Sequence, residues 1–349
     1  MIEKGKCPIC GKNNGCAMVA GTDPYACWCM TTTVPKGLLN HIPEEFRKKS
    51  CICRDCTTNY NKKVCVVGSL NVDLELSVNE FPKKGETIKA NSLETFFGGK
   101  GGNQAVAASK LGLKVSMLGS IGDDSHGDEY IQHLKKNNID VSLVKRSQGK
   151  SGQAFIEVDK SGENKIVTVG GANYQLTKEW IDDNLSDILD HDLFLISLEL
   201  PKEVSLYLIK LLSKHQKMMI LDPAPFSNFN KQMLEHVDYI TPNETEYDLI
   251  KDSLNSKHHV ILKKGCNGSS FIHNDIMVNV PAYSVESVDS VGAGDTFNAS
   301  VCFGLLFKFT IEEVLYHSNI AGALATTKSG AQCGMPTLEQ LLKLKHTSN

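Results

Sequence analysis

An acidic residue follows a glycine-rich turn in the segment Val288–Ala299, which reads VDSVGAGDTFNA. Glycines placed directly before a helix let backbone N–H groups converge on an anion, and the helix dipole adds favourable potential there. Asp295 in the first turn of that helix suits a general base, which takes a proton from an attacking hydroxyl while the amides stabilise a transferring phosphoryl group. A glycine-rich turn with Asp295 as a helix cap accounts for the same residues, so this segment alone leaves both interpretations open.

A second glycine-rich segment, Lys263–Gly268 (KKGCNG), follows an apolar strand-like run. It is a candidate nucleotide contact, although an ordinary turn has the same composition. The chain has no G-x-x-x-x-G-K-[ST] loop and no G-x-G-x-x-G after its first strand. These absences argue against a Walker-type phosphate loop and against a dinucleotide-binding fold.

Polar residues that could hold hydroxyl groups lie further towards the N-terminus. Asn71 and Asp73 follow the first predicted strand at positions i and i+2, so their side chains point the same way and can chelate vicinal hydroxyls. The segment Gly98–Asn103 (GGKGGN) opens a helix, and its glycines allow close backbone approach to a ligand beside Lys100 and Asn103. A solvated turn and a flexible surface loop remain the alternatives for these two segments.

Strands that alternate with helices position these residues. The predicted strands are Lys63–Gly68, Val115–Gly119, Asp192–Ser197, Met218–Asp222, Tyr239–Thr241 and Val260–Lys263, and the predicted helices include Asn103–Leu111 and Lys202–His215. This alternation predicts a mostly parallel sheet covered by helices on both faces.

Two other segments, Leu74–Leu93 and Ala154–Val169, have the pattern of antiparallel hairpins, and we expect them to form a small accessory sheet. Apolar residues of the second hairpin (Ala154, Ile156 and Val158) would suit a homodimer contact.

The cysteines are concentrated at one end. Eight of the twelve precede residue 57, namely Cys7, Cys10, Cys16, Cys27, Cys29, Cys51, Cys53 and Cys56. The N-terminus lacks the apolar region of a secretion signal, so clustered cysteines indicate metal ligands rather than disulfides, and we expect a cytoplasmic protein. Eight thiolates would complete two tetrahedral Zn²⁺ sites. Unligated cysteines in a disordered tail are the alternative, although about sixty residues rarely fold without a bound metal ion or disulfides.

Composition bounds the remaining possibilities. The chain has 349 residues, 41% hydrophobic and 22% charged, with a net charge of −3, which is ordinary globular usage without a basic field for nucleic acid or an acidic membrane surface. No apolar run approaches the roughly 20 residues that span a bilayer. We expect a cysteine-rich module at 1–61 and a larger domain at 62–349, joined at the polar stretch Thr57–Asn61.

Taken in order, several motifs resemble the ribokinase (PfkB) family of carbohydrate kinases over roughly Lys63–Leu344. They are GSLNVD, the FP–KGET segment, GGKGGNQAVAA, the GEN turn with GGAN after it, LDPAP, TPNETE and DSVGAGDTFNAS. The resemblance implies a ribokinase-like α/β fold with an accessory β-sheet lid, and phosphorylation of a sugar by ATP with Mg²⁺. The GSLNVD motif and the GEN–GGAN pair resemble ribokinase more than fructokinase or adenosine kinase. The N-terminal part resembles the cysteine-rich CWC family through its C-P-x-C, C-W-C and C-x-C-x-x-C elements.

The resemblance also implies residue roles. Asp295 would be the catalytic base, with Ala293 and Gly294 in the anion hole. The implied sugar contacts are Asn71, Asp73, Gly99, Lys100, Gly101, Gly102, Asn103, Glu163 and Asp295 itself. The implied nucleotide contacts are Asp222, Asn243, Glu246, Lys263, Lys264, Gly265, Cys266, Asn267, Gly268, Gly294 and Asn319, with Asn243 and Glu246 organising Mg²⁺ and phosphate through water. The implied K⁺ site is Asp289 and Val291 with backbone oxygens of Ala325, Lys328, Gly330 and Gly334.

The sequence departs from the family pattern at a few positions. Asp222 stands where several relatives have Asn, which adds negative charge near the ATP phosphates. Ser290 replaces a common Thr, and Gly102 replaces a common Ala, so we expect a looser loop there.

Three functions therefore compete. The first is phosphorylation of D-ribose to ribose 5-phosphate, which the polar set Asn71, Lys100 and Asn103 favours because it suits a pentose with intact hydroxyls. The second is a kinase for another sugar or a nucleoside, but these motifs show no aromatic platform for a base. The third is a sugar-sensing regulator with the cysteine module as a binding arm, against which the retained Asp295 argues.

Overall fold

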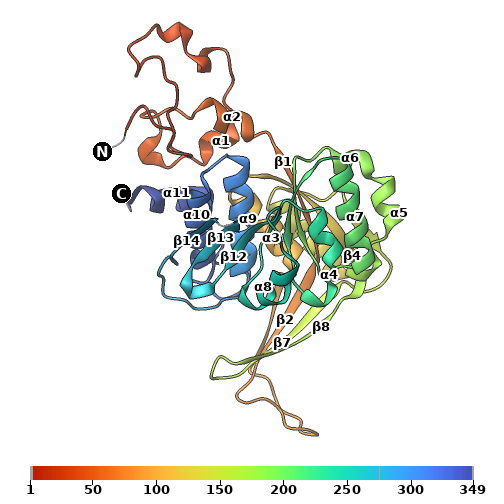
Figure 1. The fold of residues 1–349 in the computed structure, drawn as a ribbon. Helices are drawn as coiled ribbons and strands as arrows, with labels where there is room; N and C mark the ends of the chain where they lie inside the picture. Colours follow the sequence, from red (N-terminus) through yellow and green to blue (C-terminus); the bar gives the residue numbers. More distant parts are fainter. Residues whose placement is uncertain (1–2, 275, 348–349) are drawn as a thin grey trace.

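The computed structural model describes residues 3–274 and 276–347, and within them a ten-stranded main sheet forms the centre of the fold (Figure 1). Its strands, in spatial order, are β14 (Ile276–Val280), β13 (Ser269–His273), β12 (His259–Lys263), β11 (Tyr239–Ile240), β10 (Met218–Asp222), β9 (Leu193–Ser197), β1 (Lys63–Val67), β4 (Lys114–Gly122) and β5 (Ile139–Asp140), with β6 (Val144–Ser147) also paired to β4. All neighbours are parallel except β12 with β13 and β13 with β14. The predicted α/β class and the predicted strands are confirmed.

Helices cover both faces of this sheet because its strands are apolar on both sides. In β1, Val64 and Val66 belong to one buried cluster, and Cys65 and Val67 belong to the other, as the two-residue period of a strand requires. The helices are α1 (Lys36–Asn40), α2 (Arg54–Asn59), α3 (Lys100–Lys110), α4 (Ser125–Lys136), α5 (Lys178–Asp183), α6 (Leu185–Leu189), α7 (Lys202–Lys214), α8 (Glu244–Ile250), α9 (Ala293–Leu306), α10 (Ile311–Ala325) and α11 (Leu338–Thr347). Among the described residues, none of these helices has the length and apolarity to cross a membrane.

A smaller four-stranded sheet extends from the main body (Figure 1). Its order is β3 (Ser92–Gly98), β2 (Asn71–Ser77), β7 (Gly152–Val158) and β8 (Asn164–Val169). Both expected hairpins are present, because β2 pairs with β3 and β7 pairs with β8 in antiparallel register. The apolar side chains that this sheet exposes are not the expected set. Ala154 is buried, whereas Phe155, Val167 and Val169 are exposed.

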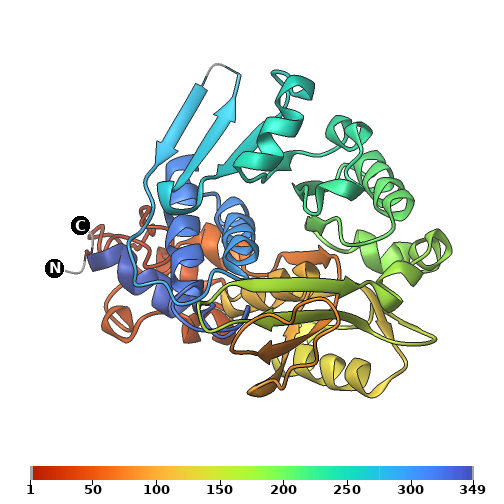
Figure 2. The same cartoon turned by 90° about the horizontal axis from the view of Figure 1, so that it is seen from below.

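The N-terminal module (residues 3–61 of the described chain) packs against helices from the other end of the sequence. Both views place it beside the blue C-terminal helices (Figures 1 and 2). Its buried Ile9, Leu38 and Ile42 belong to the same apolar cluster as α9, α10 and α11. The expected joint Thr57–Asn61 begins inside α2, where Thr57 and Asn59 are buried. The module is thus continuous with the main core.

Candidate active site and metal centre

The N-terminus of α9 lies at the edge of the sheet where the parallel strands end. Gly292 caps the helix with φ +79°, and a Cβ atom there would lie 2.3 Å from the carbonyl oxygen of Ala331, so only glycine fits this turn. Ala293, Gly294 and Asp295 form the first turn. The Ala293 N–H donates to the Ser290 carbonyl oxygen at 3.3 Å, so the N–H groups of Gly294 and Asp295 are the ones available beside the Asp295 carboxylate.

Two side chains of α3 hold Asp295. Asn103 donates from Nδ2 to Asp295 Oδ2 at 3.0 Å, and Gln104 donates from Nε2 to Asp295 Oδ1 at 3.1 Å. The carboxyl is buried. Burial raises its pKa to about 6, while the nearby Lys100 ammonium opposes this shift and Asp222 adds to it. A carboxylate with this pKa is mostly ionised at neutral pH and is a better proton acceptor than an ordinary Asp.

Asp222, at the end of β10, is tied to the same network. Gln104 Nε2 lies 3.0 Å from Asp222 Oδ2, and Lys263 Nζ lies 3.1 Å from Asp222 Oδ1. A Cβ atom built on Gly294 would lie 3.9 Å from Lys263 Nζ, so this ammonium stands beside the first turn of α9. The negative charge that Asp222 brings to the site is therefore balanced by Lys263 within a nearly buried ion pair.

The first residues of β2 form the other side of the site. Asn71 accepts a hydrogen bond at 2.7 Å from Nδ2 of Asn173, whose own Oδ1 accepts from the Leu70 N–H at 2.8 Å. Asn173 belongs to the GGAN motif, which thus fixes the orientation of Asn71. Burial raises the pKa of Asp73 to about 7, and the neighbouring Glu199 and Glu75 contribute to this shift.

Glu199 is a site residue that the sequence analysis missed. It follows β9 and accepts hydrogen bonds from the Lys100 N–H at 3.2 Å and from the Ser69 hydroxyl. Burial alone would lower the pKa of Lys100, but Asp295, Asp222, Glu199 and Glu246 together raise it. The signal in the sequence was the position of Glu199 two residues after a buried strand, at the edge where the other candidates also lie.

Glu163 does not join this site, so its predicted contact with the sugar is wrong in this structure. It lies exposed in the turn between β7 and β8, where its carbonyl oxygen accepts from the Asp159 N–H and its own N–H donates to the Asp159 carboxylate. Gly152 pairs with Asn71 and Val158 pairs with Ser77, so the turn lies at the opposite end of the small sheet. The six strand positions from Gly152 to Val158 place this turn about 20 Å from Asn71.

The sugar-side glycines pack closely in and before α3. Gly99 has φ +81°, and a Cβ atom there would lie 2.7 Å from the backbone nitrogen of Asn71. Gly101 and Gly102 lie in the first turn of α3, and both are buried. A Cβ atom on Gly102 would overlap the Tyr130 hydroxyl. The expected looser loop at Gly102 is therefore wrong, because Tyr130 fills the space.

Besides Asp222, Lys263 and Gly294, the predicted nucleotide residues lie at the start of α8, on α10 and in the turn between β12 and β13. Asn243 and Glu246 form a capping box at the start of α8, with 2.8 Å between each side-chain oxygen and the other residue's N–H. Glu246 is buried and close enough to act on Lys100. Asn319 on α10 donates to the carbonyl oxygens of Val280 and Pro281, so it anchors the chain after β14. The remaining residues, Lys264, Gly265, Cys266, Asn267 and Gly268, form the turn between β12 and β13.

The structure brings most of the predicted K⁺ residues together. Asp289 accepts from the Val291 N–H at 2.9 Å and from the Gly330 N–H at 2.8 Å. Gly334 lies against the carbonyl oxygen of Ala325, since a Cβ atom there would be 2.1 Å from it. Lys328 lies in the same loop, two residues before Gly330. The loops around Asp289 and Gly330 thus meet directly before the α9 turn.

Four cysteines of the N-terminal module form one compact group. The Sγ atoms of Cys7, Cys10, Cys53 and Cys56 lie within 4.8 Å of one another, and all four residues are buried. Two of them, Cys10 and Cys53, have Sγ atoms 3.7 Å apart, close to the roughly 3.8 Å edge of a ZnS₄ tetrahedron with bonds of about 2.3 Å. This set, which we call the buried cysteine group, fits a structural metal ion.

The other four cysteines, which we call the outer cysteine group, form two pairs. Cys27 and Cys29 have Sγ atoms 3.3 Å apart, and Cys16 and Cys51 have Sγ atoms 4.0 Å apart. Within the described chain they do not gather as tightly as the buried cysteine group. Asn14 holds this part together, because its Nδ2 donates to the Cys51 carbonyl and its Oδ1 accepts from the Cys16 N–H.

Comparison with known proteins agrees with this geometry. Residues 61–338 match the pfkB family of carbohydrate kinases, and residues 7–58 match the Cysteine-rich CWC family. The chain therefore belongs to the PfkB family and carries a sugar-kinase domain, together with a CWC-type segment at its N-terminus.

Its curated relatives include pentose kinases. The chain is 36% identical over 291 residues to the ribokinase of Bacillus subtilis (strain 168), an alignment that covers 81% of this chain and 99% of the relative. It is 33% identical over 295 residues to the deoxyribokinase of Salmonella typhi, covering 79% and 96%.

Solved structures of ribokinases also superimpose on this chain. The ribokinase of Thermotoga maritima superimposes with a TM-score of 0.74 at 34% identity, covering 82% of this chain and all of that one. The ribokinase of Arabidopsis thaliana complexed with ribose and ATP gives 0.74 at 27% identity, covering 81% and 98%.

Proposed function

We propose that this sugar kinase transfers the γ-phosphoryl group of ATP to D-ribose and so forms ribose 5-phosphate and ADP. The observation that carries the proposal is the meeting of Asp295, the free N–H groups of the α9 turn and Lys263 at one point. The ribokinase relatives, and the Arabidopsis structure with ribose and ATP, supply the substrate class.

In this mechanism the Asp295 carboxylate accepts the proton of the primary hydroxyl as its oxygen attacks the γ-phosphorus. The bond from that phosphorus to the bridging oxygen breaks, and ADP leaves with its electron pair. The Gly294 amide stabilises the negative charge on the transferring group, the Ala293 amide does so once it releases the Ser290 carbonyl oxygen, and Lys263 is placed to do the same. Asn71, Asp73, Lys100 and Asn103 hold the remaining hydroxyls, so the reacting oxygen points at Asp295.

Asn243 and Glu246 would help to hold Mg²⁺ through water, and the ion would neutralise negative charge on the ATP phosphates. K⁺ would bind between the Asp289 and Gly330 loops and hold the α9 turn in shape. Zn²⁺ would be structural, held by the buried cysteine group and also by the outer cysteine group.

A substrate panel tests the proposal. ADP formation is measured with D-ribose, 2-deoxy-D-ribose, D-fructose and adenosine at saturating ATP. We expect the highest kcat/KM with D-ribose. Preference for 2-deoxy-D-ribose would favour the second candidate, which rests on the deoxyribokinase relative at 33% identity. No turnover with any of the four would favour the regulator.

Three further parts belong to this proposal. The division at 1–61 and 62–349 is supported by the separate family matches. The homodimer is tested by size-exclusion chromatography with light scattering. A cytoplasmic location follows from the use of ATP and from thiolate metal ligands, which require reducing conditions. Fractionation of cells that produce the native chain tests the location.

A further inference from the structure

A cavity of about 810 Å³ lies at the opposite end of the main sheet from the catalytic residues. Its wall on one side is the N-terminal module, through Gly37, Asn40, His41 and Tyr60. Its other wall is formed by the amino-terminal ends of β1 and β4 and by the segments around Asp140 and His191. The cavity is large enough for a metabolite, and no step of the phosphoryl transfer uses it.

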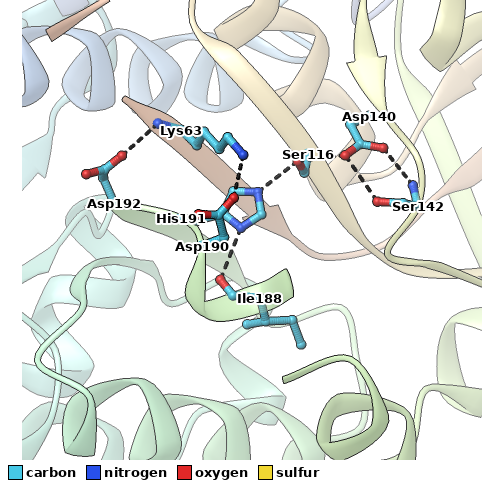
Figure 3. Close-up of polar contacts among 8 residues, drawn as sticks. All are labelled: Lys63, Ser116, Asp140, Ser142, Ile188, Asp190, His191 and Asp192. Carbon is cyan, nitrogen blue, oxygen red and sulfur yellow. Dashed lines mark hydrogen bonds and ion pairs between the residues drawn. The ribbon is translucent and has the colours of Figure 1, made fainter. Parts of the chain in front are cut away.

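One end of the cavity carries an excess of negative charge (Figure 3). Lys63 forms an ion pair with Asp190, and its backbone N–H donates to Asp192 at 2.9 Å. Asp190 chiefly, with smaller contributions from Asp140 and Asp192, raises the pKa of Lys63. The Lys63 ammonium thus forms its ion pair with Asp190, while Asp140 and Asp192 act on it without forming one. Among the described residues, Asp140 forms no ion pair of its own.

Asp140 also keeps hydrogen-bonding capacity. His191 Nδ1 donates to the Ile188 carbonyl oxygen at 3.0 Å, and its Nε2 lies 2.8 Å from the Ser116 hydroxyl. That hydroxyl donates to Asp140 Oδ2 over a long distance of 3.4 Å. The two closer donors to Asp140 are the N–H and hydroxyl of Ser142, at 2.9 and 3.1 Å. A carboxylate accepts about four hydrogen bonds, so Asp140 can take more from a ligand.

The cavity lining also carries a cation with neutral partners, Lys114, which is the direct neighbour of Lys63 across β1 and β4. Lys114 Nζ donates to Asn61 Oδ1 at 3.0 Å and lies 5.8 Å from the centre of the Tyr60 ring. No described carboxylate forms an ion pair with it. Ser116 pairs with Asp140 across β4 and β5, so Lys114 is two strand positions from the level of Asp140, a Cα separation of roughly 8 Å.

We propose that this cavity binds a small zwitterion, whose primary ammonium group contacts Asp140 and whose carboxylate or phosphate group contacts Lys114. Free amino acids and amino-sugar phosphates have this chemistry. The two unmatched charges select a molecule that carries both signs, because a ligand with one charge leaves the other protein group without a partner. Since the module forms one wall, the bound molecule would also hold the module against the sugar-kinase domain.

Isothermal titration calorimetry of the full chain tests the proposal. The probes are the twenty L-amino acids and glucosamine 6-phosphate, with methylamine and acetate as single-charge controls. We expect at least one zwitterion to bind and both single-charge probes to bind at least tenfold more weakly. Asp140→Asn and Lys114→Met should each weaken zwitterion binding by about 10- to 100-fold. Asp183→Asn and Lys202→Gln, which change exposed residues outside the cavity, should leave it unchanged.

Melting temperature and the KM for sugar and ATP show whether each variant is folded, since Asp140 and Lys114 lie outside the catalytic site. If one of the two cavity variants is unfolded, zwitterion binding to the other variant provides the test. Absence of binding by every zwitterion up to millimolar concentration would overturn the proposal. So would equal affinity in the cavity variants and in their controls.

Discussion

Replacing Asp295, the proposed catalytic base, should make this enzyme both inactive and more stable. Burial raises the pKa of Asp295 from 3.8 to about 6, so the folded state binds a proton more tightly than the unfolded chain. The stability that this group contributes is therefore complete below about pH 4 and is lost as the pH rises through about 6. Asp295→Asn introduces a neutral side chain of the same shape and removes this pH-dependent penalty together with the base.

The size of both effects follows from the contacts. A shift of about two pKa units corresponds to roughly 3 kcal/mol at pH 8. Asn has only one acceptor oxygen, so it cannot accept the hydrogen bonds of both Asn103 and Gln104. The lost bond should reduce the gain in stability by about 1 kcal/mol. The net gain of about 2 kcal/mol at pH 8 should disappear below pH 4. In the wild type, kcat/KM should fall to about a tenth of its plateau at pH 5, and the variant should lose roughly 10²- to 10⁴-fold in turnover.

Direct chromatographic measurement of ADP avoids coupling enzymes and so covers pH 5 to 8, and scanning calorimetry gives the melting temperature over the same range. Asp183→Asn, which changes an exposed carboxylate, is the matched control. Sugar and ATP binding to Asp295→Asn should persist in titration calorimetry. Wild-type turnover in the variant would refute the assignment of the base. A melting-temperature difference that does not change with pH would refute the argument from burial.

Further predictions concern the other parts of the site. Lys263→Met removes the ion-pair partner of the buried Asp222, so urea denaturation should show a loss of about 3–5 kcal/mol, most of which Asp222→Asn in the same chain should restore. K⁺ should activate the enzyme at constant ionic strength, and equal rates in tetramethylammonium chloride would contradict the cation site at Asp289. Elemental analysis should find about two Zn²⁺ per chain, and a chelator should remove the ion of the outer cysteine group first because Cys51 is exposed. Eight freely reactive thiols and no metal would exclude both metal sites.

The sequence predicted the elements of the fold because their signals are local. Continuous apolar runs marked β1, β9 and β10 to within a residue or two, and glycine placement marked the starts of α3 and α9. The two hairpins followed from turn residues within each segment. Such signals depend on neighbours in the chain, which a single sequence displays directly.

Contacts between distant residues were harder to predict. Asp222 was expected to add negative charge near ATP, but the balancing Lys263 lies 41 residues further on and shows no motif that links the two. Glu163 belonged to a correctly predicted hairpin, yet its turn faces away from the site. Glu199 had only its place after a buried strand to mark it, and it became visible once β9 was set between β1 and β10.

The packing of the N-terminal module against α9, α10 and α11 has a consequence for synthesis in the cell. The module leaves the ribosome about 290 residues before α11 does, which at 5–20 residues per second is a delay of roughly 15–60 s. During that interval Ile9, Leu38 and Ile42 have none of their C-terminal partners. A metal ion in the buried cysteine group would let the module keep its shape alone, so metal supply at the ribosome would influence how much of the chain reaches its native state.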